Sequence, residues 1–369
     1  METDHRNELN QPVFFIIGLP RSGTTLLEQM LDAHSKLAVC PEMASGYTLW
    51  RLNASKEIRD SWKHLLIINN FYTRTNIFKD LINMHLAIQA IRSFKFPVST
   101  SAWFAPLISD YLTEKKGILF GEKTPENTFF IPALYKTFPE GRFIMILRNP
   151  FDIITSLAEA VLNSENAPIP DRWIYHFAWI VKRGMLNMQL ERLPNTIDLI
   201  YVTYEDLTTN PHLVLKKICT FLNIDFEESM LTFQHRKKYA RNNEVMQRIL
   251  GRLDEPLTNQ RVNRSYSILS PLQYAYLHAF WANALKKLPY TFPPASTTLP
   301  WSMKMRLHLA LLAFNFKAYL LIDYKNKFRI QCQYFALRYL RNTIVKSRLL
   351  KHLITEEKDW QKIIEQYNT

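Results

Sequence analysis

The chemistry of this chain is concentrated first in an eight-residue segment, G-L-P-R-S-G-T-T, at positions 18–25. It follows the continuous apolar run Val13–Ile17, which is typical of a strand buried on both faces, and it precedes a helix-forming stretch. Glycines let a ligand approach the backbone closely, and the N–H groups at a helix N-terminus favour an anion. The segment therefore predicts a phosphate-binding loop.

This loop differs from the common nucleotide-hydrolysing loop at one position. The spacing of Gly18 and Gly23 is that of G-x-x-x-x-G-K-[ST], but Thr24 stands where the lysine belongs. That lysine normally reaches the outer phosphates of ATP or GTP, so its absence disfavours hydrolysis of either nucleotide. Arg21 offers a cation to the outer end of a bound anion instead.

Three more polar motifs follow or close apolar runs. They are G-E-K-T-P at 121–125, R-N-P-F-D-I-I-T-S at 148–156 and Y-E-D-L at 204–207. Because the carboxyl ends of parallel strands line one crevice, these motifs are expected at the same sheet edge as the loop.

The elements that must position these motifs alternate between strand and helix. Strands are expected at 13–17, 117–120, 142–147 and 196–202, with helices at 24–31, 128–138, 151–162, 171–193 and 211–222. This order predicts an α/β fold: a P-loop-type parallel sheet of four to five strands flanked by helices.

The domain organisation follows from changes in composition along the chain. Residues 1–289 form the expected catalytic domain, and residues 44–116 within it form a long helical insertion that would cover the acceptor. The proline-rich stretch 290–300 is expected to be a linker, and 301–369 a basic helical C-terminal extension.

Taken together, the ordered motifs between residues 12 and 225 resemble the sulfotransferases that use 3′-phosphoadenosine-5′-phosphosulfate (PAPS), with PAPS as co-substrate. The resemblance implies that Arg148 and Ser156 hold the 3′-phosphate and that Tyr204 lies near the adenosine. It implies that the 5′-phosphosulfate is bound by Arg21, Ser22, Gly23, Thr24, Thr25 and Leu26. The family's last cofactor contact has no clear match, although Arg261, Arg264 and Ser265 stand where one is expected.

Within this superfamily the closest motifs are those of the tyrosylprotein sulfotransferases and related bacterial enzymes, in which a glutamate is the base. Glu42, in C-P-E-M, matches that acidic segment, whereas His34 is the nearest histidine and more often caps a helix end. Lys123 matches a catalytic lysine in a K-T-P context, and with Arg21 it would stabilise charge during transfer. Glu122 is a weaker candidate base, or a partner of Lys123.

Composition limits the remaining classes. The chain has 369 residues, a formal net charge of +13 and three cysteines, so an anionic partner is favoured and a disulfide framework is not. No cluster with metal-ligand spacing stands out, and we expect no metal. The polar N-terminus and the absence of a spanning segment predict a cytoplasmic protein, without signal peptide or transmembrane helix.

Other functions stay open at this stage. One is a nucleotide kinase or NTPase with a degenerate phosphate loop, which would turn over ATP with Mg²⁺. Another is a non-catalytic basic protein that binds membrane or nucleic acid through residues 301–369, which carry 13 Lys and Arg against 5 Asp and Glu. For the sulfotransferase we expect no nucleic-acid partner. Its extension either packs on the core or contacts an anionic membrane surface, and its acceptor is a carbohydrate, a peptide tyrosine or a lipid.

Overall fold

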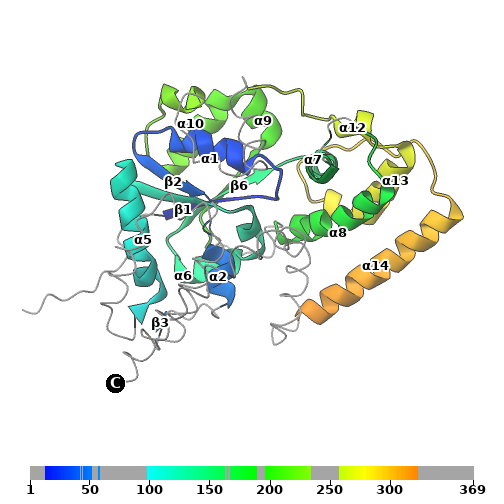
Figure 1. Cartoon of the computed structure of the whole chain (residues 1–369), viewed down its shortest axis with the longest axis horizontal. Coiled ribbons are helices and arrows are strands. Elements are labelled where there is room, and N and C mark those ends of the chain that lie inside the picture. The colour runs from blue at the N-terminus through cyan, green and yellow to red at the C-terminus, as the bar shows by residue number, and fades with distance from the viewer. Residues whose placement is uncertain are drawn as a thin grey trace, which may run out of the picture. The chain divides into compact units, whose positions relative to one another are not determined.

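The structure is a computed structural model, drawn in Figure 1. It describes residues 13–41, 43, 45–51, 57–58, 98–162, 164, 167–188, 196–233 and 257–322. The strands are β1 (Val13–Ile17), β2 (Leu37–Pro41), β3 (Glu57–Ile58), β4 (Val98–Ser99), β5 (Leu119–Lys123), β6 (Arg142–Leu147) and β7 (Leu199–Thr203).

Helices fill most of the connections between the strands. The α-helices are α1 (Thr24–Asp32), α2 (Ser45–Arg51), α5 (Thr100–Lys115), α6 (Ile131–Thr137), α7 (Pro150–Leu162), α8 (Asp171–Asn187), α9 (Tyr204–Thr209), α10 (Pro211–Leu222), α12 (Ser265–Ile268), α13 (Pro271–Leu285) and α14 (Trp301–Ile322). The 3₁₀ turns are η2 (Pro125–Phe129) and η4 (Glu228–Leu231).

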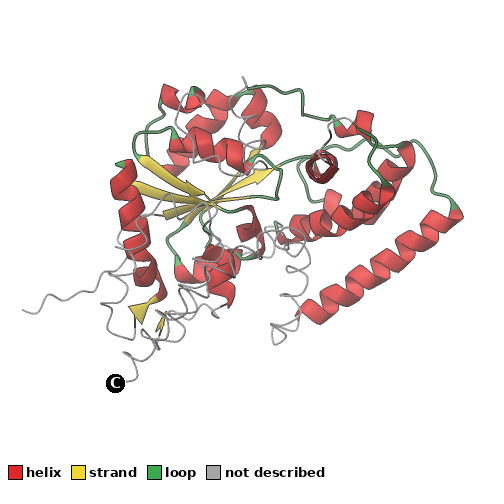
Figure 2. Ribbon diagram, in the orientation of Figure 1, coloured by secondary structure: helices red, strands yellow, loops and turns green. Residues whose placement is uncertain are grey.

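Five strands form one sheet in the order β2-β5-β1-β6-β7, and every neighbouring pair in it is parallel. Helices lie on both faces of this sheet (Figure 2), with α1, α9 and α10 on one face and α2 and α6 on the other in Figure 1. The predicted α/β class with a parallel sheet is therefore confirmed.

The strand at the centre of the sheet is buried on both faces, as its continuous apolar sequence predicts. Phe14 and Ile16 belong to the core shared with α1 and α10, while the ring of Phe15 contacts those of Phe138 and Phe143 on the opposite face. The side chains of β1 thus contribute to the apolar packing on both faces of the sheet, because successive side chains of a strand point to opposite faces.

Two strands differ from the prediction. The edge strand β2 was not predicted, although Leu37–Pro41 is an apolar run, because it is short and ends in proline. The strand expected at 117–120 instead runs over Leu119–Lys123. Glu122 and Lys123 therefore lie inside a buried strand rather than after it. Their burial is possible because Lys123 forms an ion pair with α1 and Glu122 accepts hydrogen bonds from α2 and η2.

Smaller differences concern boundaries. The last strand is shifted to 199–203, helix α8 ends at Asn187, and the helix expected at 128–138 is divided into η2 and α6 at Phe130. Most of the insertion 44–116 lies outside the described residues. Its described parts are α2, α5 and the antiparallel pair β3–β4, which the purely helical prediction lacked.

The chain divides into two compact units, Met1–Lys304 and Met305–Thr369. The start of the expected linker is anchored within the first unit, because Tyr290 donates to Glu205 (2.9 Å) and Tyr274 donates to the carbonyl of Pro293 (2.7 Å). Within the second unit only residues up to 322 are described. Among the described residues, no helix combines the length and the apolar character needed to cross a membrane.

Candidate active site

The loop between β1 and α1 has the backbone that its glycines predict. Gly23 has a φ of 99°, and a Cβ there would lie 2.5 Å from Cδ2 of Tyr204, so both conformation and space require glycine. Arg21 also adopts a left-handed conformation, with a φ of 72°. At the start of the loop, both backbone groups of Gly18 are hydrogen-bonded to the hydroxyl of Thr128.

Arg148, at the carboxyl end of β6, joins the loop to a distant segment. Its guanidinium donates to the carbonyl of Arg21 (2.8 Å) and to that of Arg261 (3.0 Å), and it lies 4.2 Å from the centre of the Tyr204 ring. The Nε of Arg21 in turn donates to Ser156 Oγ (3.0 Å) on α7. The structure thus brings together Arg21, Arg148, Ser156 and Tyr204, which are up to 183 residues apart in the sequence.

The segment 261–265 is held against this cluster by a buried carboxylate. Asp152 on α7 accepts from the backbone N–H groups of Asn263 (2.7 Å) and Ser265 (2.9 Å). Arg264 forms an ion pair with Glu159 of α7, and this ion pair also holds the segment in place. Arg261, Arg264 and Ser265 are the three candidates for a last cofactor contact. The carbonyl of Arg261 accepts from Arg148, and the backbone N–H of Ser265 donates to Asp152.

Three buried polar atoms around this cluster have no hydrogen-bond partner within the described part of the chain: Ser22 Oγ, Arg148 Nε and Ser265 Oγ. A buried donor without a partner is costly, so such atoms mark places where a ligand can bind. Two of them are on residues that the sequence predicts to be at or near a bound nucleotide. The residues present here fit a ligand that carries several anionic oxygens.

Lys123 lies on the face of the sheet that α1 covers. Its Nζ is 3.1 Å from Oε2 of Glu28, and the two side chains are 3% and 1% exposed. Glu28 is one turn beyond Thr24, so this ion pair connects the helix that begins at the loop to the carboxyl end of β5. The sequence analysis did not single out Glu28. The signal that could have identified it is an acidic residue on the apolar, buried side of a helix.

Glu122, the neighbour of Lys123, points to the other face of the sheet and does not pair with it. Its carboxylate accepts from Thr124 Oγ1 (2.6 Å) and Asn127 Nδ2 (3.0 Å), and also from the hydroxyl of Ser45. Burial raises the pKa of Glu122, and these hydrogen bonds oppose the rise. A carboxylate whose two oxygens are both engaged in this way is poorly placed to accept a proton from a substrate.

Glu42 lies outside the described residues, but its neighbours in sequence are informative. Strand β2 ends at Pro41, whose parallel register partner in β5 is Lys123. Ser45, three residues after Glu42, begins α2. Glu42 therefore belongs to the three-residue connection between the end of β2 and the start of α2.

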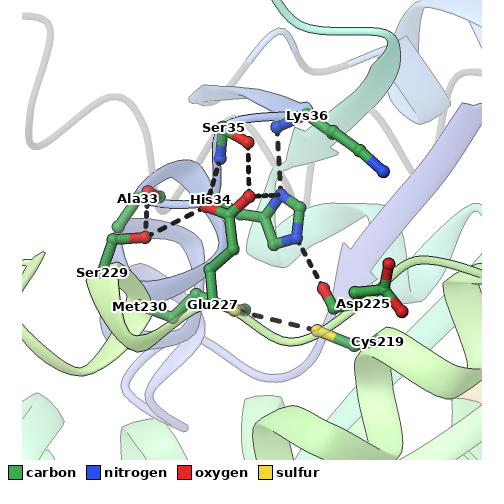
Figure 3. Close-up of polar contacts among 9 residues, drawn as sticks. All are labelled: Ala33, His34, Ser35, Lys36, Cys219, Asp225, Glu227, Ser229 and Met230. Carbon is green, nitrogen blue, oxygen red and sulfur yellow. Dashed lines mark hydrogen bonds and ion pairs between the residues drawn. The ribbon is translucent and has the colours of Figure 1, made fainter.

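His34, the alternative base, is part of a different cluster, shown in Figure 3. Its Nδ1 accepts from the N–H of Lys36 (3.0 Å), so Nε2 carries the hydrogen and donates to the carbonyl of Asp225 (2.7 Å). Glu227 accepts from Ser35 N (2.8 Å) and from the hydroxyl of Ser35 beside it. Burial by itself would raise the pKa of Glu227, but these hydrogen bonds outweigh it and lower the pKa below its usual value.

The position of this cluster separates His34 from the loop. Helix α1 begins at the loop and His34 follows its C-terminal end, about 13 Å further along the helix axis at ~1.5 Å per residue. His34 therefore joins the end of α1 to the segment after α10. Among the described residues, no group of three His, Cys, Asp or Glu side chains could hold a metal ion.

The chain belongs to the sulfotransferase family, whose sequence model matches residues 12–228. A putative protein-tyrosine sulfotransferase of Caenorhabditis briggsae is 23% identical over 224 residues, which cover 60% of this chain and 69% of the relative. Protein-tyrosine sulfotransferase A of Caenorhabditis elegans is 23% identical over 232 residues, which cover 63% of this chain and 55% of the relative.

The matches among solved structures include sulfotransferases at TM-scores below 0.5. The sulfotransferase domain from the curacin biosynthetic pathway is 17% identical and matches 77% of this chain and 99% of its own, with a TM-score of 0.49. A mouse sulfotransferase complexed with PAP is 13% identical and matches 74% of this chain and 84% of its own, with a TM-score of 0.43.

Proposed function

We propose that this protein transfers the sulfuryl group of PAPS to a hydroxyl or amine of an acceptor. The observation that carries the proposal is that Arg148 and Ser156 both contact Arg21, a residue of the loop after β1. The buried unpartnered atoms of Ser22 and Arg148 are at the same place. A loop with Thr24 in place of lysine is a poor site for ATP hydrolysis, so this arrangement favours PAPS over the kinase alternative.

The residues divide into binding and reacting groups. Arg148 and Ser156 would hold the 3′-phosphate, residues 21–26 the 5′-phosphosulfate, and Tyr204 would lie by the adenosine. When bound, PAPS supplies an activated sulfuryl group, and its transfer leaves the anion PAP (3′,5′-phosphoadenosine). Glu42 would accept the acceptor's proton, while Lys123, Arg21 and the loop N–H groups would stabilise the charge that develops.

Titration calorimetry tests the cofactor assignment. PAP should bind more tightly than AMP, and Arg148→Ala should weaken PAP binding by roughly 10- to 100-fold, the effect of one charge-assisted contact. Because the 3′-phosphate is remote from the reacting sulfur, kcat at saturating PAPS should change little in Arg148→Ala, whereas Arg21→Ala should lower kcat as well.

The opposite pattern would reverse the orientation of the cofactor. If Arg148→Ala lowered kcat at saturating PAPS and left KM unchanged, the assignments at both loops would be withdrawn. If PAP bound no better than AMP and the protein turned over ATP with Mg²⁺, the kinase alternative would replace this proposal.

The first acceptor to test is a peptide tyrosine, because two of the relatives carry that acceptor in their names. A screen with ³⁵S-labelled PAPS against tyrosine peptides, carbohydrates and lipids would identify the acceptor class. Transfer confined to carbohydrate or lipid would reject the tyrosine assignment.

We also propose that the C-terminal extension contacts an anionic membrane surface. The observation that favours this partner is an exposed apolar stripe on α14 made by Trp301, Met305, Leu309 and Leu312. These residues lie within an arc of about 80°, at 100° per residue. The helix contains no acidic residue, and Lys304 and Arg306 are exposed near the stripe.

Sedimentation with lipid vesicles checks this second proposal. The full chain should sediment with vesicles that contain phosphatidylserine and much less with phosphatidylcholine alone, and added salt should weaken the binding. Leu309→Ser with Leu312→Ser should reduce it, while Leu272→Ser, an exposed leucine on α13, should not. Equal binding by all variants, or binding to neither vesicle, would reject it.

A further inference from the structure

The 3₁₀ turn η2 contacts both sides of the candidate active site through two adjacent buried residues. Asn127 is 0% exposed and Thr128 is 1% exposed. The Thr128 hydroxyl donates to the carbonyl of Gly18 (2.9 Å) and accepts from the N–H of the same residue (2.8 Å). One side chain thus satisfies both backbone groups at the first residue of the phosphate loop.

Asn127 makes the corresponding contacts with the start of α2. Its Oδ1 accepts from the N–H of Gly46 (3.1 Å), and its Nδ2 donates to Glu122 Oε2 (3.0 Å). The backbone N–H of Gly46 can only donate, and the carboxylate of Glu122 also accepts from Ser45 and Thr124. The orientation of the Asn127 amide therefore follows from its partners. A Cβ on Gly46 would lie 2.7 Å from Asn127 Oδ1, so the two segments are in close contact.

We infer that Asn127 and Thr128 are positioning residues that hold the phosphate loop and the first turn of α2 at a fixed separation. The inference rests on the proposed function, in which the loop binds the donor and the segment before α2 carries the base Glu42. In-line transfer requires reacting atoms about 3–3.5 Å apart, and a displacement of about 1 Å can cost ~100-fold in rate. Two side chains from one short turn leave little freedom between the two segments.

A purely structural role would have a different signature. If these residues only satisfied buried polar groups, each substitution would destabilise the domain as a whole. A positioning role instead predicts that each substitution loosens its own segment. Thr128 should then affect the donor side, and Asn127 should affect the acceptor side.

The experiment compares Thr128→Val and Asn127→Leu with the wild-type full chain by amide hydrogen exchange and by PAP titration. Thr128→Val should speed exchange in residues 18–25 and weaken PAP binding by roughly 10-fold, the effect of losing one or two hydrogen bonds. Asn127→Leu should speed exchange in residues 45–49 and leave the PAP affinity within about twofold. Thr128→Ser, which keeps the hydroxyl, should restore wild-type values.

Thr137→Val is the matched control, because the buried Thr137 hydroxyl donates only to a carbonyl of its own helix, that of Ala133 (3.1 Å). It should change exchange in neither segment. Equal acceleration of both segments in either variant, or a Thr128→Val protein with wild-type PAP affinity, would overturn the inference. Failure of the wild-type protein to bind PAP would instead overturn the proposed function, and the exchange data would still test whether the two segments are held separately.

Discussion

Replacing Lys123 with methionine is expected to slow sulfuryl transfer by about 100- to 1000-fold, the loss typical of one group that stabilises developing charge. The side chain is at the carboxyl end of β5, beside the end of β2 from which the chain continues to Glu42. The measurement is single-turnover transfer of ³⁵S from PAPS to the acceptor found in the screen.

A loss of activity in Lys123→Met alone could reflect unfolding, because removing one partner of a buried ion pair costs about 3–5 kcal/mol. The double variant Lys123→Met with Glu28→Gln removes both charges and should recover much of the lost stability, as measured by urea denaturation. It should not recover transfer. If the double variant regained both stability and activity, Lys123 would have a structural role only.

The variant Glu42→Gln should lower kcat by about 100- to 10,000-fold, since it removes the group proposed to accept the acceptor's proton. Its PAP affinity should be unchanged, because residue 42 is proposed to act on the acceptor's proton, whereas Arg148 and the loop after β1 are proposed to hold the cofactor. The wild-type kcat should fall as the pH is lowered and Glu42 becomes protonated, and this acid limb should be absent from the residual activity of Glu42→Gln.

His34→Gln is the matched comparison for the base. His34 is engaged by Lys36 and Asp225 at the far end of α1, so its replacement should reduce stability and leave the pH dependence of transfer intact. Transfer abolished in His34→Gln and retained in Glu42→Gln would exchange the two assignments.

The carboxylate of Glu122 shows why neighbouring residues of one motif can have different roles. Glu122 and Lys123 are consecutive in β5, so their side chains lie on opposite faces of the sheet. Lys123 pairs with Glu28 of α1, whereas Glu122 accepts hydrogen bonds from Ser45 and Asn127. The prediction that Glu122 could be a partner of Lys123 is therefore wrong, and its burial accounts for its raised pKa.

What the amino-acid sequence determined by itself is the local part of the site. The strand, loop and helix at residues 13–32 could be predicted because they depend on contiguous residues, namely an apolar strand, two glycines and a helix start, and each has a local signal. The alternation of strands and helices likewise predicted a parallel sheet. The polar motifs at 121–125, 148–156 and 204–207 were recognised as candidates for the same sheet edge.

The tertiary structure alone decided how these parts are joined. Arg148 donates to the carbonyls of residues 127 and 113 positions away, and Glu122 is held by a hydroxyl 77 positions away. No local pattern signals such partners. The end of β5 was misplaced for the same reason: charged residues normally end a buried strand, because burying a charge without a partner is costly. Glu28, Ser45 and Asn127 remove that cost, and only the packing of their helices and turns against the sheet brings them there.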